Sequence, residues 1–261
     1  MCMGKIKEFG KQIIGNCLLS LYGNKIARSS LASVGFQCAP DYFLRGASKS
    51  WDIREINFFG ELAEKIISSH RTCLHYDRLY SIYQALLNVS KYKKKVLAVE
   101  VGVYKGGTSW FISEVLSKTA RYGWELYSFD TFEGHNPKDI SKEDASHKAG
   151  LFNDTTYESV KNLLKEYNHT FVYKGRFSDT SKVLQSLKLS FVHLDVDIYK
   201  PTLFGLNFFK RRMTKGGIII VDDYGFKTCP GVKKAVDEFV AKNDTFHFFH
   251  VLTGQAILIK K

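Results

Sequence analysis

The sequence lacks any run of about 18 consecutive apolar residues, so no transmembrane helix is expected. One apolar stretch near the N-terminus, residues 13–21, is interrupted by Gly15, Asn16 and Ser20, and no cleavage site of the A-x-A type follows it. This stretch therefore does not predict a signal peptide. Apolar residues recur at helical spacing from Ile6 to Leu21 and predict an amphipathic helix instead.

Cysteine is scarce and follows no pattern. The five cysteines are odd in number and widely spaced, and they form neither a CxxC pair nor a Cys/His cluster. Neither a disulfide framework nor a zinc site is predicted, and a cytoplasmic location fits this usage best.

Acidic residues are outnumbered, since 38 Lys and Arg face 26 Asp and Glu for a formal charge of +12. The basic residues are scattered and are not interleaved with aromatic residues, so no nucleic-acid partner is predicted. Two interpretations stay open. The charge belongs to a Lys-rich solvated surface, or it favours an acidic or nucleotide-linked glycan as a ligand.

From Lys95 onward, short apolar runs alternate with segments of helical periodicity. The predicted strands are 96–101, 125–129, 170–173, 189–194, 217–221, 246–251 and 256–259, and the predicted helices are 108–117, 157–166, 180–187, 201–211 and 231–241. This alternation predicts an α/β domain over 95–261, with a mostly parallel seven-stranded sheet and helices on both faces. Only the short turn 252–254 joins the last two strands, so they should form an antiparallel hairpin.

Residues 1–94 predict a helical N-terminal extension packed on this domain, because 51–69 and 79–89 have apolar residues at helical spacing. The polar stretch 137–156 predicts a long loop near the carboxyl ends of the strands, where ligands bind in open α/β sheets. A substrate lid and a plain disordered surface loop are both compatible with its composition.

A glycine-rich turn follows the first predicted strand, in the spacing E-x-G-x-x-x-G from Glu100 to Gly106. Gly102 permits a sharp turn, and Gly106 and Gly107 open a helix whose N–H groups can meet an anionic group. The spacing matches neither the dinucleotide pattern nor the phosphate loop. With Asp130 at the end of the second strand, placed to accept hydrogen bonds from ribose hydroxyls, the turn favours a ribonucleoside cofactor.

Carboxylates end the fourth and fifth predicted strands, at Asp195 and at Asp222–Asp223. Neighbouring parallel strands place these ends side by side, and three close carboxylates repel unless a cation holds them. A hard cation such as Mg²⁺ is the natural partner, and it would help a nearby carboxylate to deprotonate a hydroxyl acceptor. Asp197 is left open as a helix cap, because strand alternation points it away from its neighbours.

Five ordered blocks make the sequence resemble the macrocin O-methyltransferase family, which includes mycinamicin and noviose O-methyltransferases. The blocks are VEVGVYKGG at 99–107, SFDTFEG at 128–134, GRFSDT at 175–180, LDVDIY at 194–199 with Thr202, and GGIIIVDDY at 216–224 followed by AVDEF at 235–239. The resemblance runs from about Arg71 to Ala241 and implies the Rossmann-like fold of class I methyltransferases. Five strand–helix units closed by a hairpin agree with that fold.

The resemblance implies S-adenosylmethionine as methyl donor, Mg²⁺ or another divalent cation, and a sugar hydroxyl as acceptor. It implies that Asp195 is a metal ligand and the general base, with Asp222 and Asp223 as the other ligands. The implied cofactor-binding residues are Glu100, Gly102, Tyr104, Gly106, Gly107, Thr108, Asp130, Thr131, Phe132, Arg176, Phe177, Ser178 and Asp195. We expect a glycan precursor or glycosylated natural product as acceptor, free or nucleotide-linked, and a homo-oligomer.

Two other functions remain as alternatives: transfer to a non-sugar hydroxyl, or a non-catalytic module that binds S-adenosylmethionine. The full carboxylate set argues against the second. Departures from the family pattern, such as Val196 and His135, bear on the acceptor and leave the predicted metal site intact. His193 is interpreted as a structural or pocket-lining residue, and Arg71 with Thr72 is expected to approach the cofactor or the acceptor.

Overall fold

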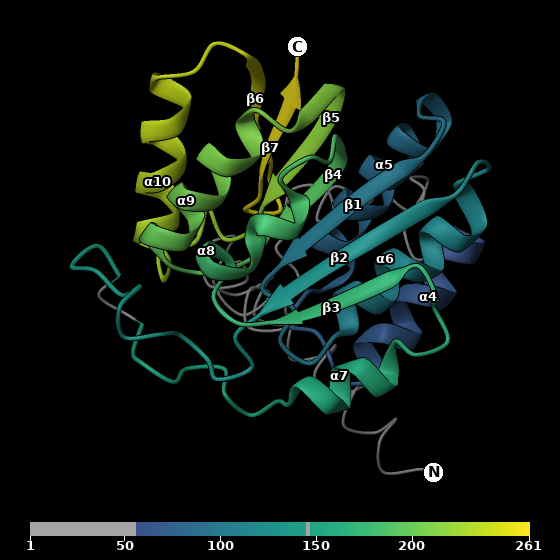
Figure 1. Cartoon of the computed structure of the whole chain (residues 1–261), viewed down its shortest axis with the longest axis horizontal. Helices are drawn as coiled ribbons and strands as arrows, with labels where there is room; N and C mark the ends of the chain where they lie inside the picture. Colours follow the sequence, from purple (N-terminus) through teal and green to yellow (C-terminus); the bar gives the residue numbers. More distant parts are fainter. Residues whose placement is uncertain (1–55, 145–146) are drawn as a thin grey trace, which may run out of the picture. The chain divides into compact units, whose positions relative to one another are not determined.

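Seven strands form the sheet around which the chain folds, and the computed structural model describes residues 56–144 and 147–261. The strands are β1 (Val96–Val101), β2 (Trp124–Asp130), β3 (Thr170–Lys174), β4 (Leu189–Leu194), β5 (Met213–Val221), β6 (Phe246–His250) and β7 (Ala256–Lys260). Their order is β3-β2-β1-β4-β5-β7-β6 (Figure 1). Strands β1 to β5 pair in parallel, and β7 is antiparallel to both β5 and β6. The predicted sheet and its C-terminal hairpin are confirmed.

One face of the sheet is covered by α4 (Asn57–Ser68), α5 (Tyr76–Tyr92) and α6 (Gly107–Thr119). Phe59, Leu62 and Ile66 recur at helical spacing on α4 and are buried with Ala98 and Phe191 of the sheet. Because an amphipathic helix gains most of its stability from burying its apolar stripe, this packing fixes α4 and its neighbours on the face.

The opposite face is covered by α8 (Phe177–Thr180), α9 (Tyr199–Lys210) and α10 (Pro230–Ala241), which Figure 1 shows on the other side of the strands. Val99 and Val192 point to this face and share a second core with Phe209 and Val236. Successive strand residues thus enter different cores, so both faces are buried, as expected for a sheet with helices on both sides. A smaller helix, α7 (Tyr157–Leu163), contacts β3 at the edge.

Some element boundaries differ from those predicted. Strand β5 begins at Met213, which pairs with Leu189, and the register shifts before Phe191 pairs with Ile218. A glycine with φ of +71°, Gly216, accommodates this irregularity. The helix predicted over 180–187 is replaced by α8 and a 3₁₀ turn, Ser181–Leu184, and α7 ends before residue 166 because the chain turns at Leu164.

The predicted N-terminal extension is described only from residue 56, where α4 and α5 pack on the sheet. The amphipathic helix expected between Ile6 and Leu21 lies outside the described residues. Within the described ranges, none of the helices combines the length and the apolar character that a membrane span requires.

Candidate functional site

Polar side chains occupy the carboxyl ends of the central strands, on the face covered by α4 to α6. Ala98 on β1 and Phe191 on β4 point into the core of that face, and Glu100 and His193 follow two positions later. In the parallel register, Glu100 lies beside His193 on one side and beside Ser128 of β2 on the other. Strand alternation therefore places a buried polar row just beyond the apolar core.

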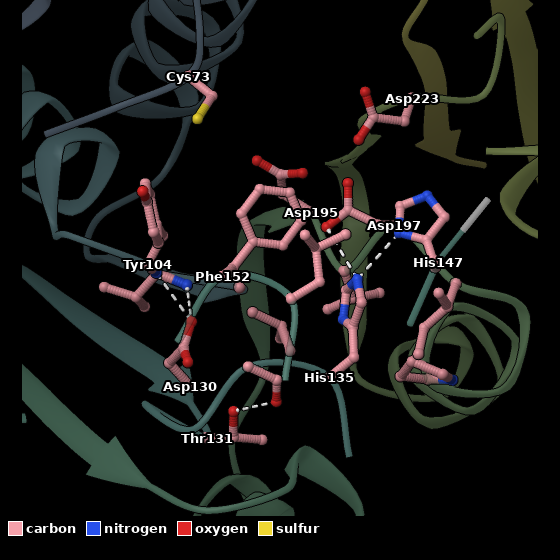
Figure 2. A pocket seen from close by; sticks show the side chains of 18 of the residues that line it. Cys73, Tyr104, Asp130, Thr131, His135, His147, Phe152, Asp195, Asp197 and Asp223 are labelled. Atoms are coloured by element: carbon pink, nitrogen blue, oxygen red, sulfur yellow. Dashed lines mark hydrogen bonds and ion pairs between the residues drawn. The ribbon is translucent and has the colours of Figure 1, made fainter. Parts of the chain in front are cut away.

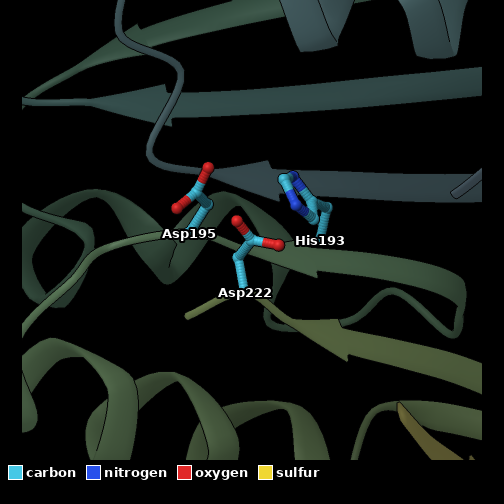
Figure 3. A group of neighbouring side chains, drawn as sticks. All are labelled: His193, Asp195 and Asp222. Carbon is cyan, nitrogen blue, oxygen red and sulfur yellow. The ribbon is translucent and has the colours of Figure 1, made fainter. Parts of the chain in front are cut away.

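Asp195 and Asp222 continue this face past the ends of β4 and β5. The main-chain N–H of Asp195 donates to the carbonyl of Val101 over 2.8 Å, and that of Asp222 donates to Leu194 over 2.9 Å. Ligand atoms of His193, Asp195 and Asp222 lie within 4.8 Å of one another (Figure 3). The structure thus brings together Asp195 and Asp222, two of the three carboxylates that the sequence predicted to meet.

The loop after β1 passes directly over Asp195. Gly102 has a φ of +94°, and a Cβ atom there would lie 1.6 Å from the carbonyl oxygen of Asp195. No side chain fits in that space, so a residue other than glycine would displace the loop. This contact ties the predicted cofactor loop to the predicted metal site.

Asp130 stabilises the conformation of the same loop by accepting hydrogen bonds from its main chain. One of its carboxylate oxygens accepts the main-chain N–H groups of Val103 and Tyr104, each over 2.8 Å, and the other accepts the N–H of Phe132 over 2.7 Å. Burial raises the pKa of Asp130, while these three donors lower it. Since a carboxylate has about four acceptor positions, Asp130 retains capacity for further hydrogen bonds.

Two glycines carry the loop into α6. Gly106 precedes the helix with a φ of +86°. Gly107 is the first helical residue, and its N–H donates to the carbonyl of Arg71 over 3.0 Å. A Cβ on Gly107 would lie 2.7 Å from the main chain of Arg71. The segment before α5 therefore packs against the start of α6, which leaves the N-terminus of this helix beside Arg71 and Thr72.

A cavity of about 520 Å³ lies where this loop meets the carboxylates (Figure 2), which is within the usual range for small-molecule sites. Of the predicted residues, those that line it are Gly102, Tyr104, Thr108, Asp130, Thr131, Arg176, Phe177, Asp195 and Asp223. Arg71 and Thr72 line it as well, as expected. In the described part of the chain, Glu100, Gly106, Gly107, Phe132, Ser178 and Asp222 are outside this lining.

Glu100 is fully buried behind the cavity rather than in its wall. One carboxylate oxygen accepts the hydroxyl of Ser109, and the other lies 3.2 Å from Nδ1 of His193. Its contacts therefore run along the polar row under the cofactor loop, whereas the sequence had suggested a direct role in binding the cofactor.

Among the described residues, the cation that pairs with the carboxylate cluster is Arg78, from the first turn of α5. Its guanidinium donates to Asp222 and lies 3.4 Å from Asp223, and it also donates to the carbonyl of Cys73 over 2.7 Å. Burial raises the pKa of Asp195 well above its ordinary value, and the neighbouring Asp222 and Asp223 raise it further. One guanidinium does not offset the carboxylates, so the cluster is suited to a further cation.

Asp197 belongs to the same cluster, although strand alternation suggested that it points elsewhere. Strand β4 ends at Leu194, and Asp197 has a φ of +60°, which turns its side chain back toward the cavity. Ligand atoms of Asp197, Asp223 and Cys229 lie within 4.8 Å of one another. Burial raises the pKa of Asp197, as does the charge of Asp223.

The loop 137–156 closes one side of the cavity where it is described. Asp139 pairs with Arg176, accepting from Nε over 2.9 Å, and Asp144 accepts the main-chain N–H of Tyr199 over 2.8 Å. His135 and His147 face each other across the base of the loop, with 3.0 Å between their ring nitrogens (Figure 2). Burial lowers the pKa of His135 to about 4, so this ring is neutral at physiological pH.

Sequence reasoning missed three residues that line the cavity, Arg78, His147 and Cys229, and it noted His135 only as a departure from the family pattern. Arg78 appeared as one of many basic residues on a predicted helix. It directly precedes the periodic run that begins at Leu79, and in the structure it is the third residue of α5, in the first turn. His147 and Cys229 come from loops whose course follows from tertiary contacts.

The comparisons with known proteins agree with this geometry. The family model described as Macrocin-O-methyltransferase (TylF) matches residues 68–256. One relative is the 8-demethyl-8-(2,3-dimethoxy-α-L-rhamnosyl)-tetracenomycin-C 4′-O-methyltransferase of Streptomyces olivaceus. It is 29% identical over 140 residues, which cover 50% of this chain and 54% of that protein. Demethyldecarbamoylnovobiocin O-methyltransferase of Streptomyces niveus is 27% identical over 66% of this chain and 69% of its own length. The chain thus spans about half the length of the first relative and about two thirds of the second.

Among solved structures, the O-methyltransferase NovP has a TM-score of 0.64 at 24% identity, over 73% of this chain and 82% of that chain. At this identity the likeness concerns the fold, and it agrees with the seven-stranded sheet described above.

Proposed function

Because the chain belongs to the macrocin O-methyltransferase family, we propose that it transfers a methyl group from S-adenosylmethionine to a sugar hydroxyl, assisted by a divalent cation such as Mg²⁺. The observation that carries this proposal is the contact of Gly102 with the main chain of Asp195. A donor held by the cofactor loop would lie directly beside the carboxylates. Gly102, Tyr104 and Thr108 of the loop line the same cavity as the carboxylates Asp195, Asp197 and Asp223.

The donor would be held by the loop Gly102–Thr108 and by Asp130. The N-terminus of α6 attracts an anionic group, and the carboxylate of the donor is such a group. Asp130 can accept hydrogen bonds from ribose hydroxyls in addition to those from the loop. When bound, S-adenosylmethionine supplies an electrophilic methyl carbon on a sulfonium.

The donor set suits a divalent cation. When all four are ionised, Asp195, Asp197, Asp222 and Asp223 carry four negative charges, and among the described residues Arg78 supplies one positive charge in return. A divalent cation would reduce this formal charge from −3 to −1. All four offer the oxygen ligands that hard cations prefer. When bound, the cation would orient the acceptor hydroxyl and lower its pKa.

Asp195 is proposed as the general base. The bound donor would supply its methyl group to the acceptor oxygen and would keep the electron pair of the broken C–S bond as a thioether. The hydroxyl proton passes to Asp195, whose pKa is raised by burial and by its carboxylate neighbours. A raised pKa makes a carboxylate a better proton acceptor near neutral pH.

A small sugar-bearing molecule is proposed as acceptor. The name of the Streptomyces olivaceus relative describes a methyltransferase of a rhamnosyl compound. In this chain, the cavity wall away from the cofactor loop carries Asn136, His135, His147 and Thr228. Donors and acceptors of this kind suit the hydroxyl groups of a sugar.

The test combines binding and turnover. Calorimetry should show that S-adenosylhomocysteine binds, and a screen of sugars, nucleotide sugars and glycosides should give labelled methyl transfer to at least one class. Asp195→Asn should lower kcat by about 10²–10⁴-fold, the range for losing a general base. Asp244→Asn, at an exposed turn between α10 and β6, is the matched control.

Different results would correct different parts of the proposal. Binding of NAD in place of S-adenosylhomocysteine would replace the donor. Unchanged turnover in a strong chelator would remove the cation while leaving the methyl transfer in place. Full activity of Asp195→Asn would remove its role as base.

A further inference from the structure

His193 has an unpaired nitrogen in a fully buried position. The side chain has no exposed surface, and Nε2 has no hydrogen-bond partner among the described residues. His193 belongs to a group with Asp195 and Asp222 in which one ligand atom of each residue lies within 4.8 Å of the others. Figure 3 shows the ring beside these two carboxylates. Because buried polar atoms are nearly always paired, such an atom calls for an explanation.

The hydrogen bonds on the other side of the ring determine which nitrogen carries the proton. Nδ1 lies 3.2 Å from Oε1 of Glu100, and the second oxygen of Glu100 accepts from Ser109. A carboxylate only accepts, so Nδ1 carries the hydrogen, and in the neutral ring Nε2 presents a lone pair. The hydroxyls of Ser109 and Ser128 lie 2.7 Å apart and complete the row.

A lone pair on a buried imidazole nitrogen, with a carboxylate on the opposite nitrogen, is the arrangement found in protein metal sites. A ligating histidine usually donates its other N–H to a carboxylate, which fixes the ring and makes the free nitrogen more basic. Glu100, His193 and the pair Asp195–Asp222 stand in that order from β1 through β4 to β5. Since Nδ1 is held by Glu100, Nε2 is the nitrogen that is free to join Asp195 and Asp222 as a ligand.

We propose that His193 is itself a ligand of the divalent cation, through Nε2, and that Glu100 orients it. This inference rests on the cation of the proposed function and changes its character, since the site would offer nitrogen as well as oxygen. Imidazole ligands suit first-row transition ions better than Mg²⁺ or Ca²⁺, which prefer oxygen. The site should therefore prefer Mn²⁺ or Co²⁺ over Mg²⁺.

The cofactor loop would gain a direct connection to the cation. Glu100 lies two residues before Gly102, on the strand that leads into the loop. The same carboxylate therefore positions the ring of His193 and stands at the base of the donor-binding turn. Glu100 acts through another residue and is a positioning residue in this proposal.

The test is a spectroscopic measurement on the whole protein stripped of metal by a chelator. Mn²⁺ is added without donor or acceptor, and electron spin echo envelope modulation records nuclei bound to the ion. The wild-type spectrum should contain ¹⁴N modulation from one imidazole. Protein grown with ¹⁵N-labelled histidine should replace it by a ¹⁵N signal, a control that needs no variant.

Two variants assign the signal. His193→Asn keeps a donor toward Glu100 but has no counterpart of Nε2, so the nitrogen modulation should disappear and the Mn²⁺ affinity should fall. His147→Asn is the matched control, because His147 lies at the second group of possible ligands, near Cys229. The signal should survive this change. Glu100→Gln should weaken Mn²⁺ binding by about 10-fold or more, as loss of an outer partner does.

The outcomes separate this inference from the proposed function. Mn²⁺ that binds through Asp222 with no histidine nitrogen in the spectrum would overturn the role of His193 and leave the proposed methyl transfer and its cation untouched. Nitrogen modulation that survives His193→Asn and disappears in His147→Asn would also overturn it. Absence of any bound divalent ion would overturn both the ligand and the cation of the proposed function.

Discussion

Replacing Arg78 by methionine should destabilise the metal-free protein at neutral pH much more than at pH 5. Arg78 is the guanidinium that donates to Asp222, lies 3.4 Å from Asp223 and donates to the carbonyl of Cys73. Its side chain is 14% exposed, and that of Asp222 is fully buried. Methionine keeps much of the volume and removes the charge, so the change isolates the electrostatic contribution.

The magnitude follows from the burial of the pair. Removing one partner of a buried ion pair typically costs about 3–5 kcal/mol, because the remaining charge is left uncompensated. We expect the lower end, about 3 kcal/mol, because neighbouring carboxyl groups of raised pKa can take up a proton in response. For a chain of this size, 1 kcal/mol shifts the melting temperature by about 2–4 °C, so the expected loss is about 6–12 °C.

The sign of the pH dependence follows from the raised pKa values of Asp195, Asp197 and Asp223. Each group binds a proton more tightly in the folded state than in the unfolded state. The stability that this proton contributes is present below the unfolded pKa of about 4 and is lost as the pH rises through the folded pKa. Loss of Arg78 raises these values further, so the destabilisation should be greatest at pH 7.5 and smaller at pH 5.

The assay is thermal unfolding of wild type and Arg78→Met, with a chelator and with excess Mn²⁺, at both pH values. Lys95→Met, which breaks an exposed ion pair with Glu125, serves as control and should cost less than about 1 kcal/mol. Mn²⁺ should reduce the difference in melting temperature between Arg78→Met and wild type, because the ion replaces the lost positive charge. An equal fall in melting temperature at both pH values, unchanged by Mn²⁺, would show that Arg78 acts through packing and not through its charge.

Three further predictions concern the loop and the cavity wall. Gly102→Ala places a Cβ 1.6 Å from the carbonyl oxygen of Asp195 and should weaken S-adenosylhomocysteine binding by about tenfold or more in calorimetry. Gly123→Ala is the control, because Gly123 has a similar φ of +97° and a Cβ there would meet nothing within 4 Å; it should leave this binding unchanged. Asp130→Asn replaces a carboxylate that accepts hydrogen bonds from three main-chain N–H groups, so it should also weaken S-adenosylhomocysteine binding by about tenfold. In urea unfolding it should lower the free energy of unfolding by about 1–3 kcal/mol. Burial raises the pKa of Cys229 to about 12. Iodoacetamide at pH 8 should therefore label this thiol about a thousandfold more slowly in the folded protein than in the unfolded chain, as followed by mass spectrometry. Comparable labelling rates would show that the thiol is not buried in solution.

The sheet could be predicted from the sequence because its central strands are buried on both faces. A strand such as Val96–Val101 is an apolar run, interrupted at Glu100 and bounded by Lys95 and Gly102, which leaves little choice of type or position. The end of α7 and the start of β5 could not be predicted as well. They depend on a turn at Leu164 and on a register shift opposite Leu189, and neither produces a local pattern.

The approximate place of the carboxylates could also be predicted, because parallel strands align their carboxyl ends. The direction of individual side chains could not. Asp197 lies beyond the end of β4 with a φ of +60°, so the alternation of strand residues no longer applies to it. Arg78 reaches the cluster only because α5 packs with its first turn at the sheet edge, which is a tertiary effect.

The apolar core and the polar row are specified by one constraint, the pairing register. Ala98, Phe191 and Ile220 must face α4 to α6 to be buried. This fixes the face on which Glu100 and His193 emerge, each two positions later along its own strand. A slip of one residue in any of these pairings would send the polar side chains into the opposite core, with no partner for their charge. Burial of the apolar residues thus selects the single register in which the buried histidine nitrogen and the strand-end carboxylates converge. The positions that carry the proposed chemistry are therefore held by the core beneath them.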